Sequence, residues 1–350
     1  MIITHVRLLH GNGGNDSFPL ADLRLAAAQD SLIEHVSARA GPGLVDIGIF
    51  TVSAPGLAAS TVAYEFVERV LVMSPKLRDW HVAAPEDGTA SLGALVEMRV
   101  RGNRPLMVWA HGISGRTGIF RPFVPRLSQT FDIYGLENHA ASASTSIEQM
   151  GAQYAAAIHE RRPSGPCEIF GYSLGGLVAL ETARQLVTLG REVTLVGLLD
   201  TAPPTVPVAP ETLAVAASLV ARGLGLEPAA ALFTEDPILE LSQRAIDARV
   251  VPSGLAVSYI KAMVETYIRN GKAADAYRPP VYHNPAALLF AEGGDAVRHR
   301  NLWRRFAPNV VAEDIVAMDH FEIIGDGIDA VTDIVEQWQR LILTDRRTPC

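Results

Sequence analysis

The sequence is poor in cysteine and has no long uninterrupted hydrophobic run. Cys167 and Cys350 are the two cysteines among 350 residues, so neither a disulfide framework nor a cysteine-rich metal site is expected. No stretch approaches the roughly 18 consecutive apolar residues of a membrane-spanning helix. The first ten residues lack the basic start, apolar centre and small-residue cleavage site of a secretory signal. These absences predict a cytoplasmic protein that does not associate with membranes.

The chain also lacks an excess of positive charge. Its formal net charge is −8 at pH 7, whereas binding to nucleic-acid phosphates favours a basic surface. One basic segment, 298–305, is interpreted as a solvated helix face. Nucleic acid is therefore not an expected partner, and no metal or cofactor of the protein's own is predicted.

What the sequence does contain is apolar residues, at 48% of the chain, in short runs separated by helical patterns. Buried strands that alternate with helices predict an α/β fold whose mostly parallel sheet is covered on both faces. We place this domain at residues 90–345. The expected strands are 95–101, 105–110, 133–136, 167–170, 193–199, 286–290 and 311–316, and the clearest helices are 146–161, 175–189 and 327–343.

Two other regions differ from this pattern. Residues 201–284 open with a proline-rich turn and continue with apolar residues at helix spacing, which predicts a helical lid inserted into the α/β domain. Residues 1–85 predict a small α+β appendage of unknown function. Its expected elements are strand 2–8, helix 20–39, strand 44–52 and helix 57–73.

The segment Gly171-Tyr-Ser-Leu-Gly-Gly176 fits the pattern Gly-x-Ser-x-Gly, directly after a predicted buried strand and directly before a predicted helix. That setting is typical of a nucleophile elbow, a sharp turn that lifts a serine hydroxyl above the end of the sheet. A serine needs a base to accept its proton and a carboxylate to orient that base. Ser173 is therefore the candidate nucleophile.

His320 is the candidate base, because it follows the last predicted strand and precedes the final helix. Two aspartates compete for the role of the acid. Asp200 ends the strand after the nucleophile helix, and Asp295 lies in a glycine-containing loop after strand 286–290. We favour Asp200, because the apolar run before it holds its carboxylate at the edge of the sheet.

The oxyanion that forms during acyl transfer needs two hydrogen-bond donors. We predict the backbone N–H of Leu174, the residue after the nucleophile, and that of Ile113 in the loop after strand 105–110, with Ser114 as the alternative to Ile113. The predicted substrate-binding residues are Tyr172, Ser114, Met263, Tyr267 and Phe321.

These residues resemble the thioesterase domains that end non-ribosomal peptide and polyketide synthetases, and their stand-alone relatives. The resemblance runs from about Leu95 to the final helix. It includes His111-Gly with Gly115, the segments 120–127 and 133–137, the Gly-Tyr-Ser-x-Gly-Gly elbow, Glu181, Asp200 and Asp-His-Phe at 319–321. It implies the α/β-hydrolase fold, and it favours Asp200 over Asp295 as the acid.

The resemblance further implies that an acyl or peptidyl carrier protein presents a thioester on its phosphopantetheine arm. Ser173 would take the acyl group, and water or a nucleophile within the chain would release it by hydrolysis or cyclisation. Four alternatives remain open: a lipid or small-ester carboxylesterase, a stand-alone editing thioesterase, an acyltransferase that uses an external acceptor, and a non-catalytic binding protein of the same fold.

Overall fold

In the computed structural model the chain forms two compact units. One comprises Met1–Leu92 with Pro210–Ile268, and the other comprises Gly93–Ala209 with Arg269–Cys350. The structure describes residues 2–10, 18–30, 32–41, 43–51, 63, 66–67, 69–71, 74–77, 80–82, 95–138, 144–227, 234–248, 250, 256–292 and 296–345.

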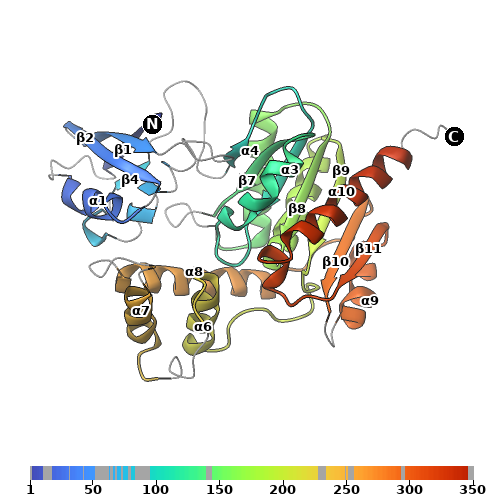
Figure 1. The fold of residues 1–350 in the computed structure, drawn as a ribbon. Coiled ribbons are helices and arrows are strands. Elements are labelled where there is room, and N and C mark those ends of the chain that lie inside the picture. The colour runs from blue at the N-terminus through green and yellow to red at the C-terminus, as the bar shows by residue number, and fades with distance from the viewer. Residues whose placement is uncertain are drawn as a thin grey trace. The chain divides into compact units, whose positions relative to one another are not determined.

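The unit that contains Gly93–Ala209 and Arg269–Cys350 is built on a seven-stranded sheet (Figure 1). The strand order is β11-β10-β9-β8-β6-β7-β5. Every pairing is parallel except that between β5 and β7. The strands are β5 (Leu95–Arg99), β6 (Leu106–Ala110), β7 (Asp132–Leu136), β8 (Cys167–Tyr172), β9 (Val193–Leu199), β10 (Ala286–Ala291) and β11 (Val310–Val316).

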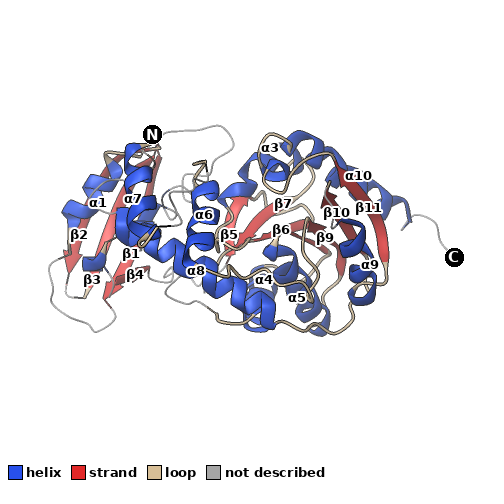
Figure 2. Cartoon of the chain, turned by 90° about the horizontal axis from the view of Figure 1, so that it is seen from below, coloured by secondary structure: helices blue, strands red, loops and turns tan. Residues whose placement is uncertain are grey.

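Helices cover both faces of this sheet (Figure 2). On one face lie α4 (Ile147–Arg161), α5 (Leu174–Thr188) and α9 (Ala296–Phe306). On the other face lie η2 (Gly118–Phe123), α3 (Val124–Leu127) and α10 (Ile328–Asp345). Each face therefore has its own hydrophobic core.

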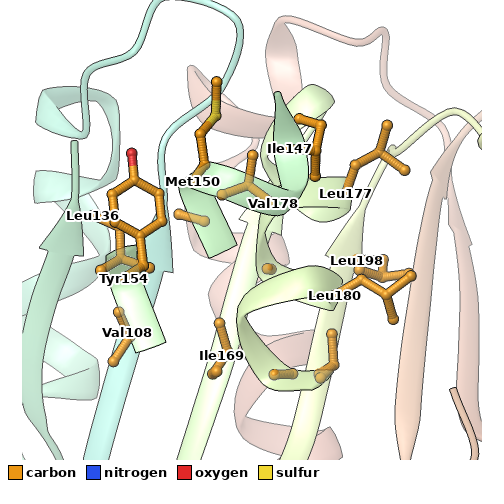
Figure 3. Close-up of a cluster of buried hydrophobic side chains, with 14 of the residues drawn as sticks. Val108, Leu136, Ile147, Met150, Tyr154, Ile169, Leu177, Val178, Leu180 and Leu198 are labelled. Carbon is orange, nitrogen blue, oxygen red and sulfur yellow. The ribbon is translucent and has the colours of Figure 1, made fainter. Parts of the chain in front are cut away.

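The core under α4 and α5 is drawn in Figure 3. Val108, Ile169 and Leu198 from the central strands pack against Met150 and Tyr154 of α4 and against Val178 and Leu180 of α5; all of them are buried. Every residue of β6, β7, β8 and β9 is buried, as expected for strands that are covered on both faces. The predicted α/β-hydrolase fold is confirmed.

The unit that contains the N-terminus has a four-stranded antiparallel sheet in the order β2-β3-β1-β4. The same unit contains helix α1 (Leu20–Ala27), the 3-10 helix η1 (Pro75–Leu77) and described helical positions between residues 63 and 71. The strands are β1 (Ile2–His10), β2 (Ile33–Gly41), β3 (Leu44–Thr51) and β4 (Trp80–Val82). This element order and strand order are those of the split βαβ arrangement, which agrees with the predicted small α+β appendage. The predicted helix 57–73 lies partly outside the described residues.

The prediction of one helix over residues 20–39 was wrong. Helix α1 ends at Ala27, and β2 begins at Ile33. In the connection between α1 and β2, the carboxylate of Asp30 accepts the N–H of Leu32 at 2.9 Å and pairs with Arg69. From Ile33 the chain pairs with β3, so tertiary pairing overrides the helix propensity of an alanine-containing segment.

Among the described residues of the predicted lid, the structure has helices α6 (Leu213–Gly223), α7 (Pro237–Asp247) and α8 (Ala256–Ala276). The side chains of Thr212 and Asp236 cap the first two helices by accepting the N–H of Val215 and of Leu239. Residues 210–268 belong to the same compact unit as the N-terminal sheet, and Tyr259 of α8 packs against that sheet's core. The segment 269–276 of α8 belongs to the unit with the seven-stranded sheet (Gly93–Ala209 with Arg269–Cys350), which we call the hydrolase unit.

Candidate active site

Ser173 lies at the sharp turn between β8 and α5. Its backbone has φ 58° and ψ −131°, and a positive φ is unusual for a residue other than glycine. The turn is held because the N–H of Ser173 donates to the carbonyl of Leu199 at 2.8 Å, and the N–H of Gly176 donates back to the carbonyl of Ser173 at 3.1 Å. This is the local geometry that a nucleophile elbow requires.

The glycines around Ser173 are dictated by close backbone approaches. A Cβ at Gly171 would collide with the backbone of Gly175, and a Cβ at Gly176 would collide with the side chain of Thr201. A Cβ at Gly175 would lie 2.5 Å from the carbonyl oxygen of His111. The motif is therefore a packing requirement of the turn as well as a sequence signature.

The three side chains predicted to form a triad lie in one hydrogen-bonded chain. The Ser173 hydroxyl lies 3.1 Å from Nε2 of His320, and Nδ1 of His320 lies 2.5 Å from Oδ2 of Asp200. A carboxylate can only accept, so Nδ1 carries the hydrogen and Nε2 is left to accept from the serine. The imidazole is thus oriented to take the proton of the hydroxyl.

Asp200 follows β9 with φ 44°, and each of its two carboxylate oxygens accepts a hydrogen bond. Besides His320, the backbone N–H of Ala291 donates to Oδ1 at 3.0 Å. Burial of Asp200 opposes its ionisation, but the hydrogen bonds from His320 and Ala291 outweigh that effect, and the pKa of Asp200 is lowered. The carboxylate stays ionised beside the imidazole.

The loop that carries His320 is a tight turn with its own caps. The Asp319 carboxylate accepts the N–H groups of Phe321 at 2.7 Å and of Glu322 at 2.9 Å, and the Glu322 carboxylate accepts the N–H of Asp319 at 2.6 Å. The hydroxyl of Tyr172 donates to the carbonyl of His320 at 2.6 Å, and its ring stacks on the imidazole with 4.6 Å between centroids. These contacts fix both the backbone and the ring of His320.

The loop predicted to supply an oxyanion donor follows β6, the parallel neighbour of β8. Glu137 is buried at the base of this loop, where it accepts from the N–H and from the hydroxyl of Thr117, each at 2.8 Å. Gly115 turns the loop with φ 77°. Ile113 in this loop and Leu174, the first residue of α5, both follow the carboxyl ends of adjacent strands, which is the arrangement the prediction assumed.

The remaining predicted site residues have different surroundings. Phe321 meets the imidazole of His320 edge-on at 5.3 Å, and the hydroxyl of Ser114 accepts the N–H of Arg116 at 3.3 Å. Tyr172 is 4% exposed, so it contacts His320 rather than offering an open surface. Met263 and Tyr267 lie on α8 within the other compact unit, and burial raises the pKa of Tyr267 to about 12. Asp295, the alternative acid, lies outside the described residues.

The described part of the chain has three further features. There, no cluster of three or more His, Cys, Asp or Glu side chains could hold a metal ion. No described helix is both long and apolar enough to cross a membrane. Cys167 is buried, and burial raises the pKa of its thiol to about 12, which leaves no reactive thiolate near neutral pH.

Sequence comparison matches residues 105–339 to the family described as Thioesterase domain. Enterobactin synthase component F of Escherichia coli (strain K12) is 31% identical over 128 residues, which are 35% of this chain and 10% of that protein. A dimodular nonribosomal peptide synthase of Bacillus subtilis (strain 168) is 26% identical over 205 residues, which are 55% of this chain and 8% of that protein. The matched regions span between 2% and 12% of the length of the first curated relatives.

Solved structures show the same fold. Holo-AB3403, a four-domain nonribosomal peptide synthetase bound to AMP and glycine, aligns with a TM-score of 0.64 at 22% identity, over 81% of this chain and 22% of that one. The Vlm2 thioesterase domain aligns with a TM-score of 0.56 at 19% identity, over 69% of this chain and 96% of that one.

Proposed function

The chain belongs to the thioesterase domain family, and on that premise we propose that it is a serine thioesterase that releases acyl or peptidyl chains from carrier-protein thioesters. The observation that supports this most strongly is the hydrogen-bonded chain Ser173–His320–Asp200 at the carboxyl edge of the sheet. The similar synthetases named above favour a thioester on phosphopantetheine, with an acyl or peptidyl carrier protein as the partner.

In the proposed mechanism the Ser173 oxygen attacks the thioester carbonyl while Nε2 of His320 takes the hydroxyl proton. The N–H groups of Leu174 and Ile113 stabilise the oxyanion. The tetrahedral intermediate collapses, the imidazolium returns its proton to the departing sulfur, and an acyl-serine remains. Ionised Asp200 holds the imidazole in the correct tautomer throughout.

Water then attacks the acyl-serine ester and gives hydrolysis, or an amine or hydroxyl of the bound acyl or peptidyl group attacks it and gives cyclisation. We propose that the helices between residues 201 and 284 act as the lid that controls access of water, and that Met263, Tyr267, Ser114 and Phe321 contact the acyl chain. For Tyr172, also predicted to bind substrate, near-complete burial and the bond to His320 favour a role in holding the base.

The test is to incubate the protein with a panel of acyl and peptidyl carrier thioesters and to measure intact masses of protein and products. The proposal predicts a transient acyl adduct on the wild-type protein, loss of the chain from the carrier, and neither event with Ser173→Ala. Product masses separate hydrolysis from ring closure. Rapid cleavage of small p-nitrophenyl esters with no attack on any carrier thioester would replace the proposal with a carboxylesterase.

A further inference from the structure

Asn270 is a buried residue of α8 that contacts the predicted oxyanion loop. It lies in the part of α8 that belongs to the hydrolase unit, and none of its surface is exposed. Its side-chain N–H₂ donates to the carbonyl oxygen of Ile113 at 2.9 Å, across 157 positions of the sequence. A buried amide that loses its hydrogen-bond acceptor costs free energy, so this bond holds the backbone of the loop and the side chain from the helix together.

The bond completes a set of contacts that fixes two consecutive peptide groups. The carbonyl of Gly112 accepts from Nδ1 of His111 at 2.7 Å and from the N–H of Gly115 at 3.1 Å. In a trans peptide the N–H points opposite to the C=O, so these bonds set the direction of the Ile113 N–H. The Asn270 bond does the same for the following peptide, whose N–H belongs to Ser114.

The C-terminal end of α8 is tied to other parts of the hydrolase unit by separate contacts. The carboxylate of Asp275 accepts the N–H of Val208 at 2.7 Å. The hydroxyl of Tyr277, just beyond the helix, donates to Glu181 of α5 at 2.8 Å. Of these described contacts, the Asn270 bond is the one that ends on the loop with the predicted donors.

We propose that Asn270 is a positioning residue that fixes the peptide group following Ile113 and so orients the N–H of Ser114, the alternative oxyanion donor, in the loop that also carries the N–H of Ile113. The inference rests on the proposed acyl-transfer function, because it assumes that these donors face a developing negative charge.

The test uses Asn270→Asp, which replaces the donor with an acceptor of the same shape. We measure kcat and KM for a carrier thioester, and the rate at which a fluorophosphonate labels Ser173. Removal of one oxyanion donor costs about 10²–10³ in rate, and misorientation costs less, so we expect kcat and the labelling rate to fall about 10- to 100-fold with KM changed less than about threefold.

Two controls separate positioning from general loss of structure. Asp275→Ala removes another contact of α8. Asn309→Asp removes an exposed side-chain amide bond, to the carbonyl of His283 at 3.1 Å just before β11, and so controls for the same chemical change at a surface position. Both should leave the labelling rate within about threefold of wild type. Thermal melting of each variant checks folding, and Asn270→Ala replaces Asn270→Asp if the latter does not fold.

Wild-type labelling rates in the Asn270 variants, or an equal loss in Asp275→Ala, would overturn the inference. Because labelling by a fluorophosphonate needs no carrier protein, the inference can be tested apart from the proposed function. A protein that is labelled at Ser173 but cleaves no carrier thioester would refute the proposed function and leave the Asn270 comparison valid.

Discussion

Each end of the seven-stranded sheet carries an aspartate with a lowered pKa, buried Asp132 at one end and partly buried Asp200 at the other, and the two carboxylates have different hydrogen-bond donors. At the amino end, Asp132 begins β7 and accepts the N–H groups of Arg101 at 2.7 Å, Gly102 at 3.0 Å and Arg104 at 3.3 Å. Arg162 adds a fourth bond at 2.9 Å. All four donors are backbone N–H groups or a permanently charged guanidinium. None of them can give up its proton near neutral pH, so this carboxylate holds the loop between β5 and β6 and takes part in no proton transfer.

At the carboxyl end, Asp200 has one backbone donor, Ala291, and one donor that can gain and lose a proton, His320. Among the described residues, Ser173 and Asp200 are also the two non-glycine residues with positive φ. Backbone strain is thus found where the proposed chemistry occurs, while the other end is held by fixed donors. Strained conformations persist when the surrounding structure over-determines them, as the glycine contacts around Ser173 do.

The largest expected effect comes from Asp200→Asn. An amide in place of the carboxylate favours the wrong tautomer of His320, and we expect kcat to fall by about 10³–10⁴. Chemical denaturation should show the free energy of unfolding changed by less than about 1 kcal/mol, within the range of ordinary single substitutions. Retention of more than a tenth of wild-type turnover would remove Asp200 from the proposed triad.

The matched change at the other end of the sheet is Asp132→Asn. It replaces an acceptor of four hydrogen bonds with a group that presents N–H to N–H, and we expect the protein to lose about 2–3 kcal/mol of unfolding free energy. Turnover below the melting temperature should stay within about threefold of wild type. A large loss of kcat in a folded Asp132→Asn protein would contradict the contrast between the two ends.

A smaller effect is expected for Tyr172→Phe, which keeps the ring on His320 and removes the bond to its carbonyl. A hydrogen bond of this kind contributes about 0.5–1.5 kcal/mol, so kcat should fall about threefold to tenfold with little change in KM. Tyr277→Phe is the control, because it removes the bond to Glu181 instead. Equal kinetic losses in both variants would show that the hydroxyl of Tyr172 has no special role at His320.

The smallest effect is a dependence of stability on pH. The folded-state pKa of Asp132 lies below its ordinary value of 3.8, chiefly because its backbone and Arg162 hydrogen bonds outweigh burial, which acts in the opposite direction. Its stabilising contribution is therefore complete above pH 3.8 and is lost as the pH falls through the folded-state pKa. The stability difference between wild type and Asp132→Asn should shrink below pH 3.8. A difference that stays constant down to the acid transition would contradict the assignment.

Local sequence patterns were sufficient to predict most of the strands and helices of the hydrolase unit. The apolar runs of the strands are explained by burial on both faces. The glycines around Ser173 specify the turn in advance, because few other residues fit those backbone approaches. Chain order favoured His320 as the candidate base, and the structure places its Nε2 3.1 Å from the Ser173 hydroxyl, because the loop after the last strand lies at the same edge of the sheet.

Contacts that depend on tertiary packing could not be predicted in this way. Nothing local distinguishes Asn270 from other helical asparagines, since its partner Ile113 lies 157 positions away. The same applies to Tyr172, whose hydroxyl reaches a loop 148 positions further along the chain. The helix predicted over 20–39 failed for a related reason, because strand pairing with β3 decides the conformation of residues 33–41.

In the proposed function, His320 and Asp200 make the Ser173 hydroxyl reactive. The most direct measurement is the labelling rate with a fluorophosphonate, followed by peptide mass analysis, for wild type, Ser173→Ala and His320→Ala. We expect one adduct on the wild-type peptide that contains Ser173, none on Ser173→Ala, and labelling of His320→Ala at least about 10³-fold slower. Unchanged labelling in either variant would contradict the account.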